Sequence, residues 1–218
     1  MSIPVNERRA PYWVVAGVIS FGCAAFIVSL HSSTDPSGEK ARGTQGMVVT
    51  QEYQDVTISG KNLSLYAGTV DDSSLGAMAP FMKGKGFEGN TVSVSPGTPT
   101  LLVFLAHWCL HCQKEVPQLV KWYESGKAPV DLDIIAVATA TTIEAPNYPP
   151  SMWLSGEKWP ALWPVIVDNK EGAAGAAYGL AGFPYFVLLD AEGKVVGRSS
   201  GQMSGQELEQ FIGRSLNP

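Results

Sequence analysis

The feature that most constrains the fold is a buried strand that leads into a cysteine pair and then into a helix. Residues 101–106 (LLVFLA) form a short uninterrupted apolar run, which is typical of a strand buried on both faces of a sheet. The apolar residues that follow recur at helical spacing and predict one buried helix face: Cys112, Val116, Leu119, Val120 and Tyr123. The sequence therefore predicts a strand–turn–helix unit, with Cys109 and Cys112 at the turn.

Strands and helices alternate along the rest of the chain. The apolar and turn patterns predict strands at residues 90–95, 132–139, 165–168, 185–190 and 195–198. They predict helices at residues 151–157 and 171–178, and a last helix that begins after Ser204, with Glu207 completing a capping box. A β-α-β unit followed by a β-β-α unit predicts an α/β fold: a three-layer sandwich whose mixed central sheet carries helices on both faces.

The N-terminal region predicts a membrane anchor. No charged residue occurs between Pro11 and Leu30, and a helix of about 20 residues spans roughly 30 Å, the thickness of the hydrocarbon core. Arg8 and Arg9 precede this run, which predicts a cytoplasmic N-terminus at residues 1–10, a transmembrane signal anchor at 11–31 and a cell-membrane, single-pass topology. The polar residues 32–46 predict a flexible tether. Residues 47–218 then form an extracytoplasmic domain whose core begins at about residue 75.

Two other interpretations of the N-terminal region stay open. A cleaved signal peptide has a shorter apolar region of about 7–15 residues and a small-residue cleavage site, and no Ala-x-Ala pattern follows the apolar run here. A lipoprotein processed at Cys23 would fit the preceding Gly22, but Ser20 and Phe21 match the usual lipobox poorly. We interpret Cys23 as a small apolar residue of a lipid-facing helix.

The charge of the chain argues against nucleic acid as a partner. The formal net charge is −5, and Glu7, Arg8 and Arg9 are the charged residues before residue 34, so the rest carries a net charge of −6. Binding to phosphates requires clustered Lys and Arg residues, which an acidic domain of this kind lacks. We therefore expect protein partners rather than nucleic acid.

The cysteine pair predicts redox chemistry. A disulfide between two cysteines that are separated by only two residues does not hold a small fold together. A cysteine at a helix N-terminus faces unpaired N–H groups and the positive end of the helix dipole, which favour the thiolate that attacks disulfides. We expect Cys109 to be the exposed attacking thiol and Cys112 the more buried resolving thiol. His111, between them, can add positive charge near the Cys109 sulfur. No cofactor is needed.

A metal site is the alternative interpretation of the same cluster. Cys109 and Cys112 could bind zinc or copper with the flanking residues His107 and His111, and soft thiolates suit Cu(I). Structural zinc sites usually draw their second ligand pair from a separate segment, and no further Cys or His follows Cys112. His107 follows a strand end and can point away from the pair. The alternative function is therefore a copper- or zinc-handling protein.

From about residue 75 to its C-terminus the chain resembles the thioredoxin superfamily, in particular the membrane-anchored TlpA/ResA-like branch. The resemblance covers about two thirds of the chain. Its marks are residues 76–81 (GAMAPF), residues 106–112 (AHWCLHC), Glu115, Pro117 and residues 182–184 (GFP). The resemblance implies a thioredoxin-like fold and thiol–disulfide exchange with extracytoplasmic protein thiols and disulfides. It also implies a redox-active Cys109–Cys112 disulfide and a membrane redox partner, and cytochrome c maturation is a familiar task of reducing relatives.

The resemblance also assigns roles to residues outside the cysteine pair. It implies that Pro184 is cis and faces the active-site disulfide, and that the backbone of Phe183 pairs with a bound substrate strand. Trp108 would shield the disulfide. Glu115 would accept a proton near Cys112, although a solvated helix residue is the simpler interpretation of a lone glutamate.

Two departures from the family pattern bear on the direction of the reaction. Val103 stands where thioredoxins proper carry a buried aspartate, so the proton relay of that aspartate is absent. Leu110 and His111 replace the dipeptides common in reducing members, and a histidine in this place is a feature of strongly oxidising DsbA-type sites. The sequence therefore leaves open whether the protein donates or removes disulfides.

Overall fold

The predicted buried strand lies at the centre of the larger sheet. The structure is a computed structural model that describes residues 50–69 and 71–216. In that sheet the order is β6-β5-β4-β7-β8. Strands β4 (Thr100–Leu105), β5 (Asp133–Ala138) and β6 (Val165–Val167) run parallel, and β7 (Tyr185–Leu189) pairs antiparallel with both β4 and β8 (Val195–Ser200). All six residues of β4 are buried, because the sheet is covered on both faces.

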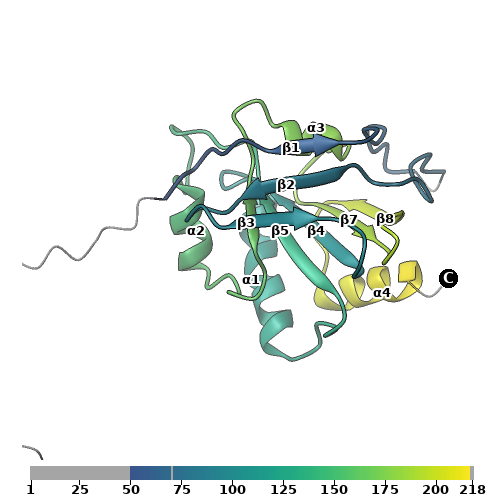
Figure 1. Ribbon diagram of the computed structural model, residues 1–218. Coiled ribbons are helices and arrows are strands. Elements are labelled where there is room, and N and C mark those ends of the chain that lie inside the picture. Colours follow the sequence, from purple (N-terminus) through teal and green to yellow (C-terminus); the bar gives the residue numbers. More distant parts are fainter. Residues whose placement is uncertain (1–49, 70, 217–218) are drawn as a thin grey trace, which may run out of the picture. The chain divides into compact units, whose positions relative to one another are not determined.

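One face of the larger sheet is covered by helices. Helix α1 (Leu110–Glu124) follows β4 after a short turn, and Pro117 lies inside it without ending it. Helix α4 (Gly205–Leu216) lies beside α1 (Figure 1). Helix α2 (Pro150–Gly156) adds Trp153 to the same apolar cluster. The capping box predicted for α4 is present, since the Glu207 N–H donates to Ser204 Oγ and Glu207 Oε2 accepts from the Ser204 N–H.

The opposite face of the larger sheet carries a helix, as predicted, and also a second, smaller sheet. The short helix α3 (Ala173–Ala177) lies on it, together with an antiparallel sheet of β1 (Thr57–Ser59), β2 (Phe81–Lys85) and β3 (Thr91–Val94) (Figure 1). The strand predicted at residues 90–95 is β3, which forms a hairpin with β2. The inward side chains of this hairpin, Met82, Val92 and Val94, pack against the larger sheet. Helices therefore lie on both faces of the larger sheet, as predicted, and the small sheet of β1, β2 and β3 adds to the apolar cover of this face.

A buried ion pair ties the segment before the core to the larger sheet. The Arg198 guanidinium, on β8, donates two hydrogen bonds to the Asp72 carboxylate, one of them at 2.6 Å, and another of 2.7 Å to the Ser64 carbonyl. The hydrogen bonds from Arg198 hold the pKa of Asp72 below its usual value, although burial opposes this shift. Ser64 and Asp72 are therefore both tied to the larger sheet, which carries the cysteines at the end of β4.

The predictions for the N-terminal region lie outside the described residues. They are the cytoplasmic N-terminus at 1–10, the transmembrane helix at 11–31 and the tether at 32–46. Among the helices formed by residues 50–216, none combines the length and the apolar character that crossing a bilayer requires.

Candidate active site

Cys109 is the residue at which strand β4 gives way to helix α1. It is the N-cap of α1, with extended backbone angles of φ −75° and ψ 119°. Its N–H donates to the Ala106 carbonyl at 3.0 Å, and its own carbonyl accepts from Gln113 at 3.0 Å. No side chain caps this end of α1 and its first turn carries no acidic residue. The N–H groups of that turn and the helix dipole are therefore left to favour a negative charge on the half-buried Cys109 sulfur.

Cys112 differs from Cys109 in its surroundings. Both are free thiols, but Cys112 has no exposed surface. Burial raises the pKa of the Cys112 thiol far above its usual value, and the nearby Cys109 and Glu115 add to the rise, whereas a backbone hydrogen bond from Ala106 opposes it. The protein thus holds one accessible sulfur and one enclosed, protonated sulfur. This asymmetry supports the predicted division into attacking and resolving thiols.

Glu115 lies on the buried face of α1, one turn after Cys112. Its carboxyl has no exposed surface, so the interpretation of a solvated helix residue was wrong. Glu115 Oε2 accepts a hydrogen bond of 3.0 Å from the Met203 N–H, while Oε1 has no partner among the described residues. Burial raises the pKa of Glu115 to about 7, although the hydrogen bond from Met203 opposes this shift. A carboxyl of this kind can take up and release a proton near neutral pH.

The buried carboxyl comes from a different element than in thioredoxins proper. Val103, where those proteins carry an aspartate, is fully buried in the apolar cluster that also holds Cys112 and Val116. The aspartate relay is absent, as the sequence indicates, but α1 supplies the carboxyl of Glu115 instead. The signal was present in the sequence, because Glu115 follows Cys112 at i+3 and precedes Leu119 by four residues, both on the buried helix face.

The loop before β7 faces the attacking cysteine. The Phe183–Pro184 peptide bond is cis, as the resemblance implied. The Cys109 thiol donates a sulfur hydrogen bond of 3.8 Å to the Phe183 carbonyl. The Trp108 ring packs edge-on against Phe183, with the ring centroids 5.9 Å apart and the planes at 81°. These contacts bring Phe183 and Pro184 to the site from 74 residues further along the chain.

The two histidines near the cysteines have different environments. His111 is exposed, and its Nδ1 lies 2.9 Å from Gln202 Oε1, in the loop before α4. His107 is buried, and the backbone of the 142–146 segment occupies both of its ring nitrogens. A metal held by the cysteines would therefore not find a free nitrogen on His107. No group of three or more Cys, His, Asp or Glu side chains in the described part of the chain is arranged to hold a metal ion.

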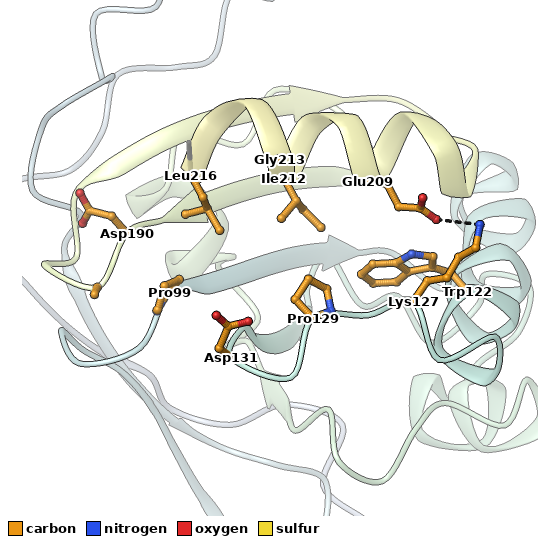
Figure 2. Close-up of a pocket in the computed structure, with 11 residues that line it drawn as sticks. Pro99, Trp122, Lys127, Pro129, Asp131, Asp190, Glu209, Ile212, Gly213 and Leu216 are labelled. Atoms are coloured by element: carbon orange, nitrogen blue, oxygen red, sulfur yellow. Dashed lines mark ion pairs between the residues drawn. The ribbon is translucent and has the colours of Figure 1, made fainter. Parts of the chain in front are cut away.

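A cavity lies at the end of the larger sheet that is opposite the cysteines. Its volume is about 590 Å³. Figure 2 shows the residues that line it, at the end of the sheet where β4 and β5 begin. Pro99, Asp131 and Asp190 lie across from the end of α4. Cys109 follows the other end of β4. The cysteine site itself lies on the surface beside the Phe183–Pro184 loop, as suits a site that receives a protein chain.

The fold and the site together define a class of enzyme. A mixed sheet, a helix that begins at an uncapped cysteine, a second cysteine one turn on and a cis-proline loop beside the first cysteine are the parts of a thiol–disulfide oxidoreductase. Residues 91–215 match the family model described as a thioredoxin-like domain, and the chain belongs to that family.

Named relatives and solved structures agree with this assignment. The chain is 27% identical over 150 residues to the thiol-disulfide oxidoreductase ResA of Bacillus cereus, covering 67% of this chain and 82% of the relative. It is 30% identical over 128 residues to the methylamine utilization protein MauD of Methylophilus methylotrophus, covering 57% and 54%. It is similar in structure to a thiol:disulfide interchange protein from Bacteroides sp., with a TM-score of 0.50, 27% identity and coverage of 66% and 91%.

Proposed function

We propose that the protein is an extracytoplasmic, membrane-anchored thiol–disulfide oxidoreductase that exchanges disulfides with protein clients. The observation that carries the exchange function is the pairing of the accessible Cys109, at an uncapped helix N-terminus, with the buried Cys112 one turn on. The uncharged run from Pro11 to Leu30 supports the anchor. An anchored domain would act on proteins at that membrane surface, and a membrane protein would restore its redox state.

The exchange proceeds in two displacement steps. The Cys109 thiolate attacks one sulfur of a client disulfide, so that a bond forms between Cys109 and that sulfur while the other client sulfur leaves as a thiolate. Cys112 then gives its proton to the Glu115 carboxylate and attacks the Cys109 sulfur. The Cys109–Cys112 disulfide forms, the second client sulfur leaves, and two electrons have passed to the client. The reverse sequence donates a disulfide to a client dithiol.

Glu115 and the loop before β7 have distinct parts in these steps. Cys112 is enclosed and its pKa is raised, so it needs a nearby proton acceptor to become a nucleophile. Glu115, whose pKa is about 7, is the buried carboxyl that acts on it. The backbone of Phe183, whose carbonyl lies beside the Cys109 sulfur, is suited to pair with an extended client segment next to cis-Pro184.

The full-length protein in detergent is expected to titrate as a reversible two-electron couple in thiol–disulfide buffers, with about 30 mV for each tenfold change in the ratio of oxidised to reduced protein. Alkylation of the remaining thiols and mass spectrometry would measure that ratio. A midpoint near about −270 mV would assign a reductant and one near about −120 mV an oxidant. A pair that is never oxidised by these buffers would contradict the proposed function.

Replacing His111 tests whether its charge favours the Cys109 thiolate. His111→Ala is expected to slow alkylation of Cys109 by roughly two- to fivefold, because an exposed charge near a helix terminus contributes about 0.3–1 kcal/mol. Gln202→Ala, which removes only the hydrogen-bond partner of His111, is the matched control. Equal alkylation rates of native protein and His111→Ala at every pH would exclude His111 from the mechanism.

A further inference from the structure

A buried histidine lies two residues before the attacking cysteine, and the exchange steps do not use it. His107 is only 1% exposed. Its Nδ1 lies 2.6 Å from the Pro146 carbonyl, and its Nε2 lies 3.1 Å from the Thr142 N–H. A carbonyl can only accept and an N–H can only donate, so Nδ1 must carry a proton and Nε2 must not. The contacts therefore require a neutral ring with its proton on Nδ1.

The backbone of His107 extends the same set of contacts. Its carbonyl accepts one hydrogen bond of 3.1 Å from the Gln113 side chain, on helix α1, and one of 3.2 Å from the Asn147 side chain. The ring and the carbonyl of one residue thus hold residues 142–147 at three points and join them to the start of α1. We call this set of hydrogen bonds the His107 clamp.

The clamped segment continues to the aromatic side chains at the site. Trp108 Nε1 donates a hydrogen bond of 2.7 Å to the Ala140 carbonyl, and the Tyr148 ring meets the His107 ring edge-on at a centroid distance of 6.0 Å. Ala140 and Asn147 have positive φ values of 50° and 61°, a backbone region that an alanine rarely adopts. A segment in such a conformation persists only where its surroundings hold it, and the His107 clamp supplies that hold.

We propose that His107 is a positioning residue for reaction with protein clients. By fixing residues 140–148, the clamp holds Trp108 against Phe183, so that these two rings form a wall beside Cys109 along which a client chain must lie. A small disulfide needs only the Cys109 sulfur, whereas a protein disulfide needs the wall in place. This inference rests on the proposed exchange function and adds to it how the site favours protein clients.

The test compares a protein disulfide with a small one. The reduced full-length protein would react in single turnovers with insulin and with oxidised glutathione, followed by the fluorescence change or by quenched alkylation. His107→Phe keeps a ring but loses both ring hydrogen bonds. It is expected to lower the ratio of the insulin rate constant to the glutathione rate constant about tenfold, which corresponds to about 1.4 kcal/mol of lost transition-state positioning.

Two further variants test the two ring hydrogen bonds of His107 separately. His107→Asn places an amide N–H where Nδ1 donates, and His107→Gln can place a carbonyl where Nε2 accepts, so each is expected to restore part of the ratio. A ratio equal to the native one in folded His107→Phe would overturn the proposal, as would an equal loss with both disulfides. If these variants do not fold, ¹⁵N NMR of the native protein decides: a proton on Nδ1 of His107 supports the clamp and a proton on Nε2 refutes it.

Failure of this inference and failure of the proposed function give different results. A native protein that reacts with neither insulin nor glutathione would count against disulfide exchange itself. The NMR measurement of the His107 tautomer needs no turnover, so it would still decide whether the clamp exists.

Discussion

Cys112→Ser is expected to accumulate as mixed disulfides with client proteins, whereas Cys109→Ser is expected to form none. Without the Cys112 sulfur, the bond between Cys109 and the client sulfur forms but cannot be resolved from within the protein. Without Cys109, the remaining thiol is fully buried and its pKa is raised, so it neither meets a client nor ionises readily. Either substitution should lower the rate of complete exchange by at least about a thousandfold, because each removes a nucleophile.

The experiment requires expression of both variants and of the double variant Cys109→Ser/Cys112→Ser in a cell whose clients are present. Acid quenching, alkylation and non-reducing electrophoresis would show complexes that disappear on reduction, and mass spectrometry would locate the linkage. The double variant measures complexes that involve Cys23. Equal trapping by the two single variants would contradict the division into an attacking and a resolving thiol, because it would mean that both sulfurs reach clients.

Glu115→Gln is expected to make the protein more stable at alkaline pH and slower in its second displacement step. The pKa of Glu115 is raised from 4.5 in a model peptide to about 7 in the folded protein. The native state therefore favours the protonated carboxyl, and its stability falls as pH rises from the unfolded value through the folded one. The amide that replaces the carboxyl cannot ionise, so the variant avoids this loss, which amounts to about 3 kcal/mol.

Urea unfolding of native protein and variant at about pH 4.5 and about pH 8 would measure the difference in stability, which should be small in acid and close to its full size above pH 7. Glu124→Gln, an exposed glutamate at the end of the same helix, is the matched control. In rapid quench experiments, decay of the mixed disulfide should slow about a hundredfold in Glu115→Gln, as expected for loss of a general base. A stability difference that does not vary with pH would show that Glu115 ionises freely in the folded protein.

Local sequence patterns predicted much of the fold. The apolar run at 101–106, the helical stripe from Cys112 to Tyr123 and the capping box of Ser204 and Glu207 each lie within a short segment, and each predicted its element within a few residues. The periods of strands and helices are properties of the backbone, so a segment reports them without its neighbours. The position of the cysteine pair, between a buried strand and its helix, followed from these local elements.

These local patterns could not predict the contacts between distant segments of the chain. The small sheet of β1, β2 and β3 covers the larger sheet beside α3, and the local patterns did not place it there, because any apolar face of the right size can cover another. Glu115 accepts a hydrogen bond from the Met203 N–H, 88 residues away, and the position of Glu115 on the buried helix face does not reveal this partner. The role of His107 depends on the conformation of residues 140–148, a segment without periodicity.

The sequence by itself determined the chemistry of this protein: two sulfurs one helical turn apart, the first of them at a helix N-terminus. The tertiary structure decided the surroundings of that chemistry: how the Glu115 carboxyl is buried and hydrogen-bonded, and which loops lie next to Cys109. The physical reason is that the pattern of apolar residues is set by the periodicity of each element, whereas burial and hydrogen bonding at the site are set by chain segments that only folding brings together.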